Sequence, residues 1–294
     1  MCIRDRGVFG RLGHNRSVME VVSTAIQEDA DGIAVSSYQG GHIEYFKYII
    51  DMLQDSGRPD IRVFGGGGGV IVPDEISELH DYGVARIYSP SDGQQIGLQG
   101  MIDDMVSKCR RESADMPGFV ANNLAENDTK DLALLISEIE RGNPDAISFL
   151  DRNYSEVKAP PILGITGTGG SGKSSLTDEL VQRFRLYSED NTRIAILAVD
   201  PTRKKTGGAL LGDRIRMNSI DTSQVFVRSL ATRNAGGGIP SLLSDVIKAC
   251  SIWSFNLIIV ETPGIGQGDI SVVPYVDKTI YVMTPEYGLS LIHI

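Results

Sequence analysis

Apolar residues in the first part of the chain follow two spacings in turn, one typical of helices and one typical of strands. Between Val18 and Ile26 they recur on one helical face, and Ser17 and Glu20 form a capping-box pair ahead of them. Short apolar runs at 32–36, 61–64 and 84–88 predict strands, with amphipathic helices between them. Because strands that alternate with helices pair in parallel through right-handed crossovers, this pattern predicts a doubly wound sheet.

The strand pattern stops between about residues 112 and 160 and then returns. In the gap, Leu132, Leu135, Ile136 and Ile139 mark one face of a helix, which predicts a helical connector. After it, strands are predicted at 162–166, 194–199, 225–228, 257–260 and 279–283. We therefore predict an α/β protein with two doubly wound parallel-sheet domains joined by a helical connector. The predicted bounds are 1–112 for the first domain, 113–158 for the connector and 159–294 for the second domain.

Both ends of the sequence fall outside this pattern. Residues 1–6 show no periodicity that leads into the first helix, and residues 289–294 stop where the second sheet still needs strands. We therefore expect the chain to be a fragment of a longer protein, truncated at both ends.

Composition narrows the functional classes. The formal net charge of −10 argues against a nucleic-acid partner, because phosphate backbones require a basic protein face. No apolar stretch approaches the ~20 residues that a membrane helix needs, so no membrane contact is expected. Cys2, Cys109 and Cys250 lie far apart without metal-ligand spacing, which indicates free thiols in a reducing compartment. These features together predict a cytoplasmic protein.

The run from Gly167 to Ser174 reads G-T-G-G-S-G-K-S and fits the phosphate-binding pattern G-x-x-x-x-G-K-[ST]. In such a loop the backbone N–H groups turn toward nucleotide phosphates, Lys173 brings a positive charge to the β- and γ-phosphates, and the Ser174 hydroxyl can ligate Mg²⁺. Lys173 is the candidate catalytic residue. A plain glycine-rich turn is disfavoured because strand, loop and helix come in the expected order. The candidate nucleotide-binding residues here are Gly167, Gly170, Ser171, Gly172, Lys173, Ser174 and Ser175.

Acidic residues follow two later strands, where a nucleotide hydrolase needs groups that hold Mg²⁺. Asp200 follows the strand at 194–199, Asp213 comes thirteen residues later, and Glu261 ends the strand at 257–260. An open α/β sheet delivers metal-binding groups at the carboxyl ends of its strands. Asp200 and Asp213 could each instead cap a helix. Together with the phosphate loop, they are predicted to be metal and switch groups.

Three further motifs carry a family resemblance. The runs VDPT from Val199, GDRIRM from Gly212 and ETPGIGQ from Glu261, together with the phosphate loop, resemble the G-protein chaperones of cobalamin-dependent acyl-CoA mutases. The resemblance implies GTP binding and hydrolysis with Mg²⁺. It assigns the metal to Ser174, Asp200, Asp213, Glu261 and Thr262, the phosphates to residues 170–175, and an approach to the nucleotide to Arg216.

Two expected features of a GTPase are missing or undecided. The guanine-recognition motif Asn-Lys-x-Asp is absent after the predicted strand at 279–283, so a preference for GTP over ATP depends on the resemblance alone. The water-activating group also stays open. Gln267 could orient a water molecule, as glutamines do in some GTPases, or it could be an ordinary surface residue.

The first domain resembles the cobalamin-binding domain of the same mutases, through LGHNRSV from Leu12, SSYQGGHIEYF from Ser36 and FGGGGGVIVP from Phe64. The resemblance places the nucleotide tail of the cofactor beside Ser36, Ser37, Gly66, Gly67, Gly68 and Gly69. Glycine there leaves room for a flat heterocycle between backbone segments. The cobalt-ligating histidine of the family stands in an Asp-x-His-x-x-Gly loop that this sequence lacks. His14 and His42 lie in other segments, so neither is assigned to cobalt.

The order of the domains resembles the fused mutases of this family, in which the G-protein chaperone lies between the cobalamin domain and a substrate barrel. The resemblance implies adenosylcobalamin as a cofactor beside GTP and Mg²⁺. It also implies a homodimer in the intact protein and an acyl-CoA substrate held by a barrel outside this sequence. Two alternatives stay open. One is a stand-alone cobalamin-trafficking GTPase without isomerase activity, and the other is a kinase, for which no acceptor pocket or lid is evident.

Overall fold

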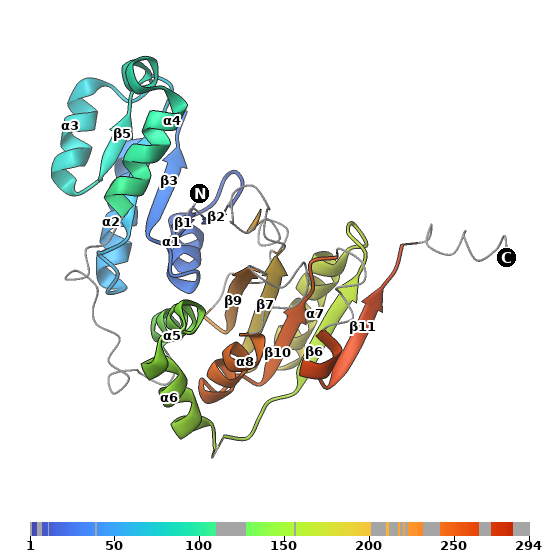
Figure 1. Cartoon of the computed structure of the whole chain (residues 1–294). Coiled ribbons are helices and arrows are strands. Elements are labelled where there is room, and N and C mark those ends of the chain that lie inside the picture. The colour runs from blue at the N-terminus through green and yellow to red at the C-terminus, as the bar shows by residue number, and fades with distance from the viewer. Residues whose placement is uncertain are drawn as a thin grey trace. The chain divides into compact units, whose positions relative to one another are not determined.

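The computed structural model in Figure 1 describes residues 2–4, 8–10, 12–38, 40–109, 128–155, 157–200, 210–211, 217, 220, 223–231, 242–264 and 272–284. For residues 2–4, 8–10, 200 and 210–211 it describes the backbone alone. The chain forms two compact units, Met1–Gly118 and Phe119–Ile294. Both are built on sheets with parallel strands and helices, which confirms the predicted α/β class.

The first unit contains three parallel strands with helices between them. Its elements after the first eleven residues are α1 (Val18–Gln27), β3 (Gly32–Ser36), α2 (His42–Asp55), β4 (Arg62–Gly66), α3 (Pro73–Tyr82), β5 (Arg86–Tyr88) and α4 (Pro90–Cys109). The register places Ser36, Gly66 and Tyr88 side by side where the strands end. The predicted capping box of α1 is confirmed, because the N–H groups of Glu20 and Ser17 donate to each other's side chains at 3.2 and 2.7 Å.

Two short strands precede α1 that the sequence pattern did not predict. β1 (Cys2–Arg4) and β2 (Val8–Gly10) pair antiparallel, and β1 also pairs antiparallel with β3. Within this unit the strands follow the order β5-β4-β3-β1-β2, so its sheet is mixed. Neither residues 2–4 nor residues 8–10 lie in an apolar run like that at 84–88, which explains the omission. By pairing with β3, β1 satisfies backbone groups that an open edge would leave free.

The core of the first unit lies between the sheet and its helices. Phe46 of α2, Ile33 of β3 and Val22 of α1 are almost fully buried in it. A Cβ atom at Gly65 would stand 2.4 Å from the Phe46 ring and 2.6 Å from Ile87, so only glycine fits at this point of β4. The apolar periodicity of the sequence therefore corresponds to real core contacts.

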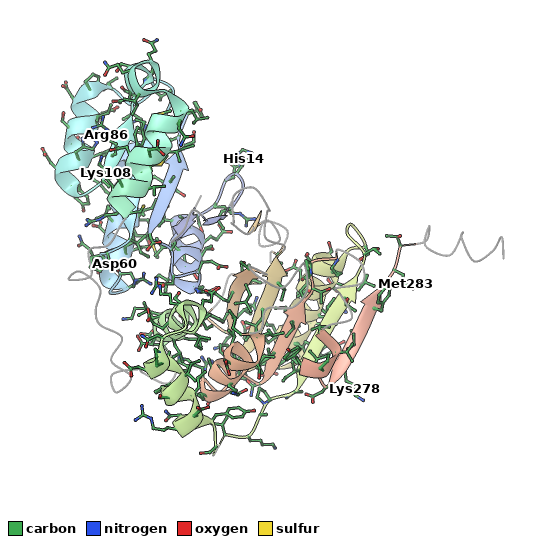
Figure 2. The ribbon with its side chains drawn as sticks, viewed as in Figure 1. His14, Asp60, Arg86, Lys108, Lys278 and Met283 are labelled. Carbon is green, nitrogen blue, oxygen red and sulfur yellow. The ribbon has the colours of Figure 1, made fainter. Side chains whose placement is uncertain are left out.

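A buried charge cluster ties the segment after α2 to the end of α1. Arg58 Nη2 lies 2.8 Å from Asp29 Oδ1, and Arg58 Nε lies 2.9 Å from Asp60 Oδ1. The side chains of Arg58 and Asp29 are 3% and 1% exposed, and Asp60 is labelled in Figure 2. Hydrogen bonds to both carboxylates raise the pKa of Arg58 against the opposing effect of burial. The cluster stabilises the segment between α2 and β4, where the sequence shows neither helical nor strand periodicity.

The second unit contains five parallel strands in the order β11-β6-β10-β7-β9 (Figure 1). Its helices are α5 (Thr129–Arg141), α6 (Pro144–Tyr154), α7 (Lys173–Tyr187) and α8 (Leu243–Ile252). Its strands are β6 (Ile162–Gly167), β7 (Ile194–Asp200), the short β8 (Leu210–Leu211), β9 (Val225–Ala231), β10 (Leu257–Glu261) and β11 (Lys278–Val282). Each of the five strands predicted here is present, with ends shifted by a few residues.

Alternate residues of the central strands of the second unit face opposite layers. Ile194 and Ile196 of β7 pack in a core that includes Val181 of α7. Ala195 and Leu197 pack on the other face, in a core formed with α5, α6 and α8. Helices thus cover both faces of this parallel sheet, as a doubly wound fold requires.

The helices of the predicted connector belong to this second core. Leu132, Leu135 and Leu150 are fully buried against the sheet. The indole N–H of Trp253 donates to the carbonyl of Asp128 at 2.9 Å, which fixes the start of α5 against the end of α8. The apolar face that the sequence predicted therefore packs within the second unit. The domain bounds at residues 112 and 158 stay predictions.

A buried ion pair joins α5 to the sheet. Arg228 of β9 is fully buried, and its Nη2 donates to Glu140 at 2.9 Å and to Ser137 at 2.8 Å. We expect Glu140→Ala to lower the free energy of unfolding of the second unit by about 3 kcal/mol, because it leaves a buried guanidinium without its carboxylate. Glu179→Ala, which removes an exposed pair with Arg183, is the control and should leave the free energy of unfolding nearly unchanged. Equal effects of both variants in urea unfolding would contradict this expectation.

Two further sequence predictions can be compared with the described residues. Cys109 and Cys250 are buried thiols that belong to no disulfide among the described residues, as predicted, and burial raises the pKa of Cys250 to about 12. No helix in the described part of the chain is long and apolar enough to cross a membrane.

Candidate nucleotide site

The phosphate loop lies between β6 and α7, at the edge of the sheet where the parallel strands end. Glu261, the last residue of β10, pairs in register with Ile165 of β6 and therefore lies beside the loop. A hollow of about 80 Å³ opens there. It is lined by Gly169, Gly170, Gly172, Lys173, Ser174, Ser175, Glu261 and Pro263. Sequence reasoning assigned all of these residues to the site except Gly169 and Pro263.

The start of α7 presents backbone donors to this hollow. Gly172 is the N-cap residue and has a φ of 90°, a left-handed conformation that favours glycine. No side chain caps this end of the helix, and the first turn contains no acidic residue. Because the first amides of a helix have no partner within it and carry its positive dipole end, this terminus suits an anion such as phosphate.

Lys173 folds back across the loop that precedes it. Its ammonium group donates to the carbonyls of Gly167 at 3.1 Å and Thr168 at 3.0 Å, and the residue is only 7% exposed. An ammonium group has three donor hydrogens, and these two bonds to described residues use two of them. The positive charge is thus held at the loop in a position from which it can reach a phosphate oxygen.

Gly264, in the segment after β10, approaches this lysine closely. Its φ is 73°, and a Cβ atom placed there would stand 2.4 Å from Lys173 Nζ and 2.9 Å from the amide nitrogen of Gly169. The backbone of the ETPGIGQ run therefore packs directly on the phosphate loop. The family resemblance covers this glycine as part of a motif, and the structure adds a steric reason for it.

Glu261 is bonded to hydroxyl groups of α7. Ser174 Oγ donates to Glu261 Oε1 at 2.6 Å, and Thr177 Oγ1 lies 3.0 Å from Glu261 Oε2. Ser174 and Glu261 are 6% and 2% exposed. A serine hydroxyl that donates its hydrogen keeps its lone pairs, so Ser174 can still ligate a cation. Oxygen donors are the ligands that Mg²⁺ prefers, and this pair fits such an ion.

Of the other predicted metal ligands, the structure describes the side chain of Thr262 but not those of Asp200 and Asp213. Asp200 ends β7, next to β10 in the sheet, where Glu261 pairs with Ala198, but its side chain lies outside the described residues. Asp213, Arg216 and Gln267 also lie outside them. The Thr262 hydroxyl donates to Thr166 Oγ1 at 3.0 Å and is buried. These metal assignments stay predictions.

In the first unit, the predicted cofactor-tail residues come together where β3 and β4 end. The N–H of Ser37 donates to the carbonyl of Gly66 at 2.9 Å, and a Cβ atom at Gly67 would stand 2.5 Å from the carbonyl oxygen of Ser37. Gly68 and Gly69 have positive φ values of 57° and 92°. Ser36 and Ser37 thus lie beside the segment of four glycines, 66–69, where the two strands end. The contact of these residues with a cofactor stays a prediction.

Neither His14 nor His42 was assigned to cobalt from the sequence. His42, at the start of α2, is 7% exposed, and its Nε2 lies 3.0 Å from Glu75 Oε2. His14 is exposed before α1 (Figure 2). Hydrogen bonds from the Val72 N–H and His42 lower the pKa of Glu75, so this carboxylate favours its charged form. His42 is therefore a structural hydrogen-bonding group within the first unit.

A buried lysine in a glycine loop, a helix start without a side-chain cap and a strand-ending carboxylate bonded to the loop serine define a P-loop nucleotide-binding protein. Residues 130–294 match the family described as methylmalonyl-CoA mutase-associated GTPase MeaB, and residues 9–93 match the B12 binding domain. The chain belongs to the MeaB GTPase family and carries a B12-binding domain ahead of its GTPase part. The predicted family and the predicted cofactor classes, GTP and cobalamin, are confirmed at this level.

Curated relatives match both parts of the chain together. The fused isobutyryl-CoA mutase of Cupriavidus metallidurans is 58% identical over 95% of this chain and 26% of its own length. The protein of the same description from Geobacillus kaustophilus is 52% identical over 94% of this chain and 26% of its own length. This chain thus spans about a quarter of these relatives. A solved structure described as LAO/AO transport system kinase is 23% identical, with a TM-score of 0.41, and the match covers 55% of this chain and 48% of that one.

Sequence reasoning missed Thr177 as a neighbour of Glu261. Its signal was present but weak, because Thr177 follows Lys173 by one helical turn and so shares its face of α7. Only the pairing of β6 with β10 brings Glu261 within hydrogen-bond distance of that face.

Proposed function

We propose that this chain is the cobalamin-binding and GTPase part of a fused mutase that rearranges isobutyryl-CoA to n-butyryl-CoA with adenosylcobalamin. Its GTPase part controls the loading of cobalamin. The supporting observation is that one polypeptide carries a B12-binding domain followed by a MeaB GTPase domain, and is 58% identical over 95% of its length to a fused isobutyryl-CoA mutase. The acyl-CoA is bound by a barrel outside this sequence. The intact protein is a cytoplasmic homodimer.

Each side chain of the nucleotide site has a role in this proposal. The backbone amides of residues 170–175 and the Lys173 ammonium group bind the phosphates. Lys173 also stabilises the negative charge that develops when the γ-phosphoryl group is transferred to water. Ser174 presents a hydroxyl oxygen to Mg²⁺, and Glu261 orients it through the 2.6 Å hydrogen bond. Bound Mg²⁺ supplies charge neutralisation at the β- and γ-phosphates. Asp200, Asp213 and Thr262 complete the proposed metal group, and Arg216 approaches the nucleotide.

Nucleotide binding by this chain tests the GTPase part of the proposal. Calorimetry with GTP and with ATP, each in the presence of Mg²⁺ and of a chelator, should show tighter binding of GTP and a dependence on Mg²⁺. Release of inorganic phosphate from GTP then reports hydrolysis. Equal binding of ATP and GTP would contradict the guanine preference, and the absence of binding to either nucleotide would refute the GTPase assignment.

The continuation of the reading frame tests the mutase part. An acyl-CoA-binding barrel encoded downstream supports the fused mutase. A stop codon soon after the end of the GTPase domain would support the stand-alone cobalamin-trafficking GTPase instead.

We further expect this chain to bind cobalamin without a bond from histidine to cobalt. The sequence lacks the Asp-x-His-x-x-Gly loop, His42 is bonded to Glu75, and binding through the cofactor tail alone should be weak. An absorption spectrum of the chain with added cobalamin should match that of the cofactor without a histidine ligand. His14→Ala is the control and should leave the spectrum unchanged. A spectrum typical of histidine-ligated cobalt would contradict this expectation.

A further inference from the structure

Thr177 is a fully buried residue on the face of α7 that points toward the nucleotide site. Its hydroxyl has one hydrogen and two acceptors, the carbonyl of Lys173 at 3.0 Å and Glu261 Oε2 at 3.0 Å. The other oxygen of the carboxylate, Oε1, accepts from Ser174 at 2.6 Å. Both oxygens of Glu261 are therefore in contact with hydroxyls that project from one helix.

The length of the Glu261 side chain makes this second contact important. A glutamate has one more rotatable bond than an aspartate, so its carboxylate samples more positions unless both oxygens are held. Thr177 can hold one of them, because a charged carboxylate is a stronger acceptor than a carbonyl for the single hydroxyl hydrogen, and because a β-branched side chain has a restricted χ1. The carbonyl of Lys173 alone would satisfy the buried hydroxyl. The approach to Glu261 is therefore an additional contact that the fold of α7 does not require.

We propose that Thr177 is a positioning residue that holds Glu261, and through it the Ser174 hydroxyl, for Mg²⁺. This inference depends on the proposed GTPase function and extends it to the metal. The inference distinguishes the affinity of the site for Mg²⁺ from its affinity for the nucleotide. Thr177 sets the affinity for Mg²⁺, and the backbone amides and Lys173 set the affinity for the nucleotide without metal.

The test is a Mg²⁺ titration of the binding of a fluorescent GTP analogue to the chain. Thr177→Val keeps the shape of the side chain and removes the hydroxyl. It should raise the Mg²⁺ concentration for half-maximal effect about tenfold, because the carboxylate loses a hydrogen bond to a charged group. Binding of the analogue in chelator should stay at the wild-type level. Thr177→Ser should restore the wild-type Mg²⁺ dependence.

Coupling between the two residues gives a second readout. In Glu261→Asp the carboxylate is withdrawn by about one carbon–carbon bond, roughly 1.5 Å, and no longer reaches Thr177. Adding Thr177→Val to Glu261→Asp should then change the Mg²⁺ dependence by less than twofold, in contrast to its effect in the wild-type chain. Ser251→Ala is the matched control, because Ser251 is also buried and donates to the carbonyl four residues earlier, on α8. It should leave the Mg²⁺ dependence unchanged.

The outcomes are distinguishable. If Thr177→Val and Ser251→Ala both leave the Mg²⁺ dependence unchanged, or if Thr177→Val weakens binding equally in chelator, the inference is wrong while the GTPase function stands. If the wild-type chain binds no nucleotide, both are refuted. Should Thr177→Val fail to fold, Thr177→Ala takes its place with the same expected results.

Discussion

Lys173→Ala should abolish tight binding of GTP, with a loss of affinity of a hundredfold or more. The variant removes the buried ammonium group that lies within 3.1 Å of the loop carbonyls of Gly167 and Thr168. A phosphate in the hollow would then lack a charge-assisted hydrogen bond, the strong kind in proteins, and would face two carbonyl oxygens that have lost their donor. Isothermal titration calorimetry with Mg²⁺ and GTP measures the change.

The control for this variant is Lys158→Ala. Lys158 is exposed, precedes β6 and does not line the hollow, so its removal should leave the affinity for GTP within about twofold. Unchanged affinity in Lys173→Ala would show that the phosphates are not held at this loop.

Gly264→Ala should have the second large effect, a loss of GTP binding of about a hundredfold. The added methyl group would stand 2.4 Å from Lys173 Nζ and 2.9 Å from the Gly169 nitrogen, so either the lysine or the phosphate loop must move. Sites of this kind are sensitive to shifts of about 1 Å. The variant also forces alanine into a left-handed conformation at a φ of 73°, which costs roughly 1–2 kcal/mol.

Gly142→Ala separates the backbone strain from the contact. Gly142 ends α5 with a φ of 74°, nearly the same as that of Gly264, and a Cβ atom there meets nothing within 4 Å. Both variants should lose the stability that the left-handed conformation costs in thermal unfolding, Gly264→Ala should lose more because of its contacts, and only Gly264→Ala should lose nucleotide affinity. If Gly142→Ala weakens GTP binding as much, the effect of Gly264 is one of general stability.

The order of helices and strands was largely predictable from the sequence, because the patterns that indicate each element are local. The capping box of α1, the strand before the phosphate loop and the apolar face of α5 are each visible within a window of a few residues. The hairpin of β1 and β2 was not predictable, since neither segment contains an apolar run long enough to indicate a strand. The packing of α5 and α6 in the core of the second unit was also outside the reach of local pattern. An amphipathic helix shows that it needs a partner and does not show which one.

The candidate nucleotide site divides in the same way. Lys173, Ser174 and the loop glycines lie next to one another in the sequence, and the spacing of the motif reflects the geometry of one strand, one loop and one helix start. Thr177 and Gly264 depend on residues far away along the chain. Their contacts with Glu261 and Lys173 exist only because β10 pairs with β6.

The amino-acid sequence by itself determined the two α/β parts, the phosphate loop and the family, since each depends on short-range patterns of residue types. The tertiary structure alone decided that Glu261 is held between Ser174 and Thr177, that Gly264 packs on Lys173, and that Arg228 pairs with Glu140. These contacts join residues that lie more than 80 positions apart in the sequence. Thr177 and Glu261, for example, are separated by 84 positions. Steric fit and the burial of charge act between neighbours in space, and only the completed sheet makes such residues neighbours.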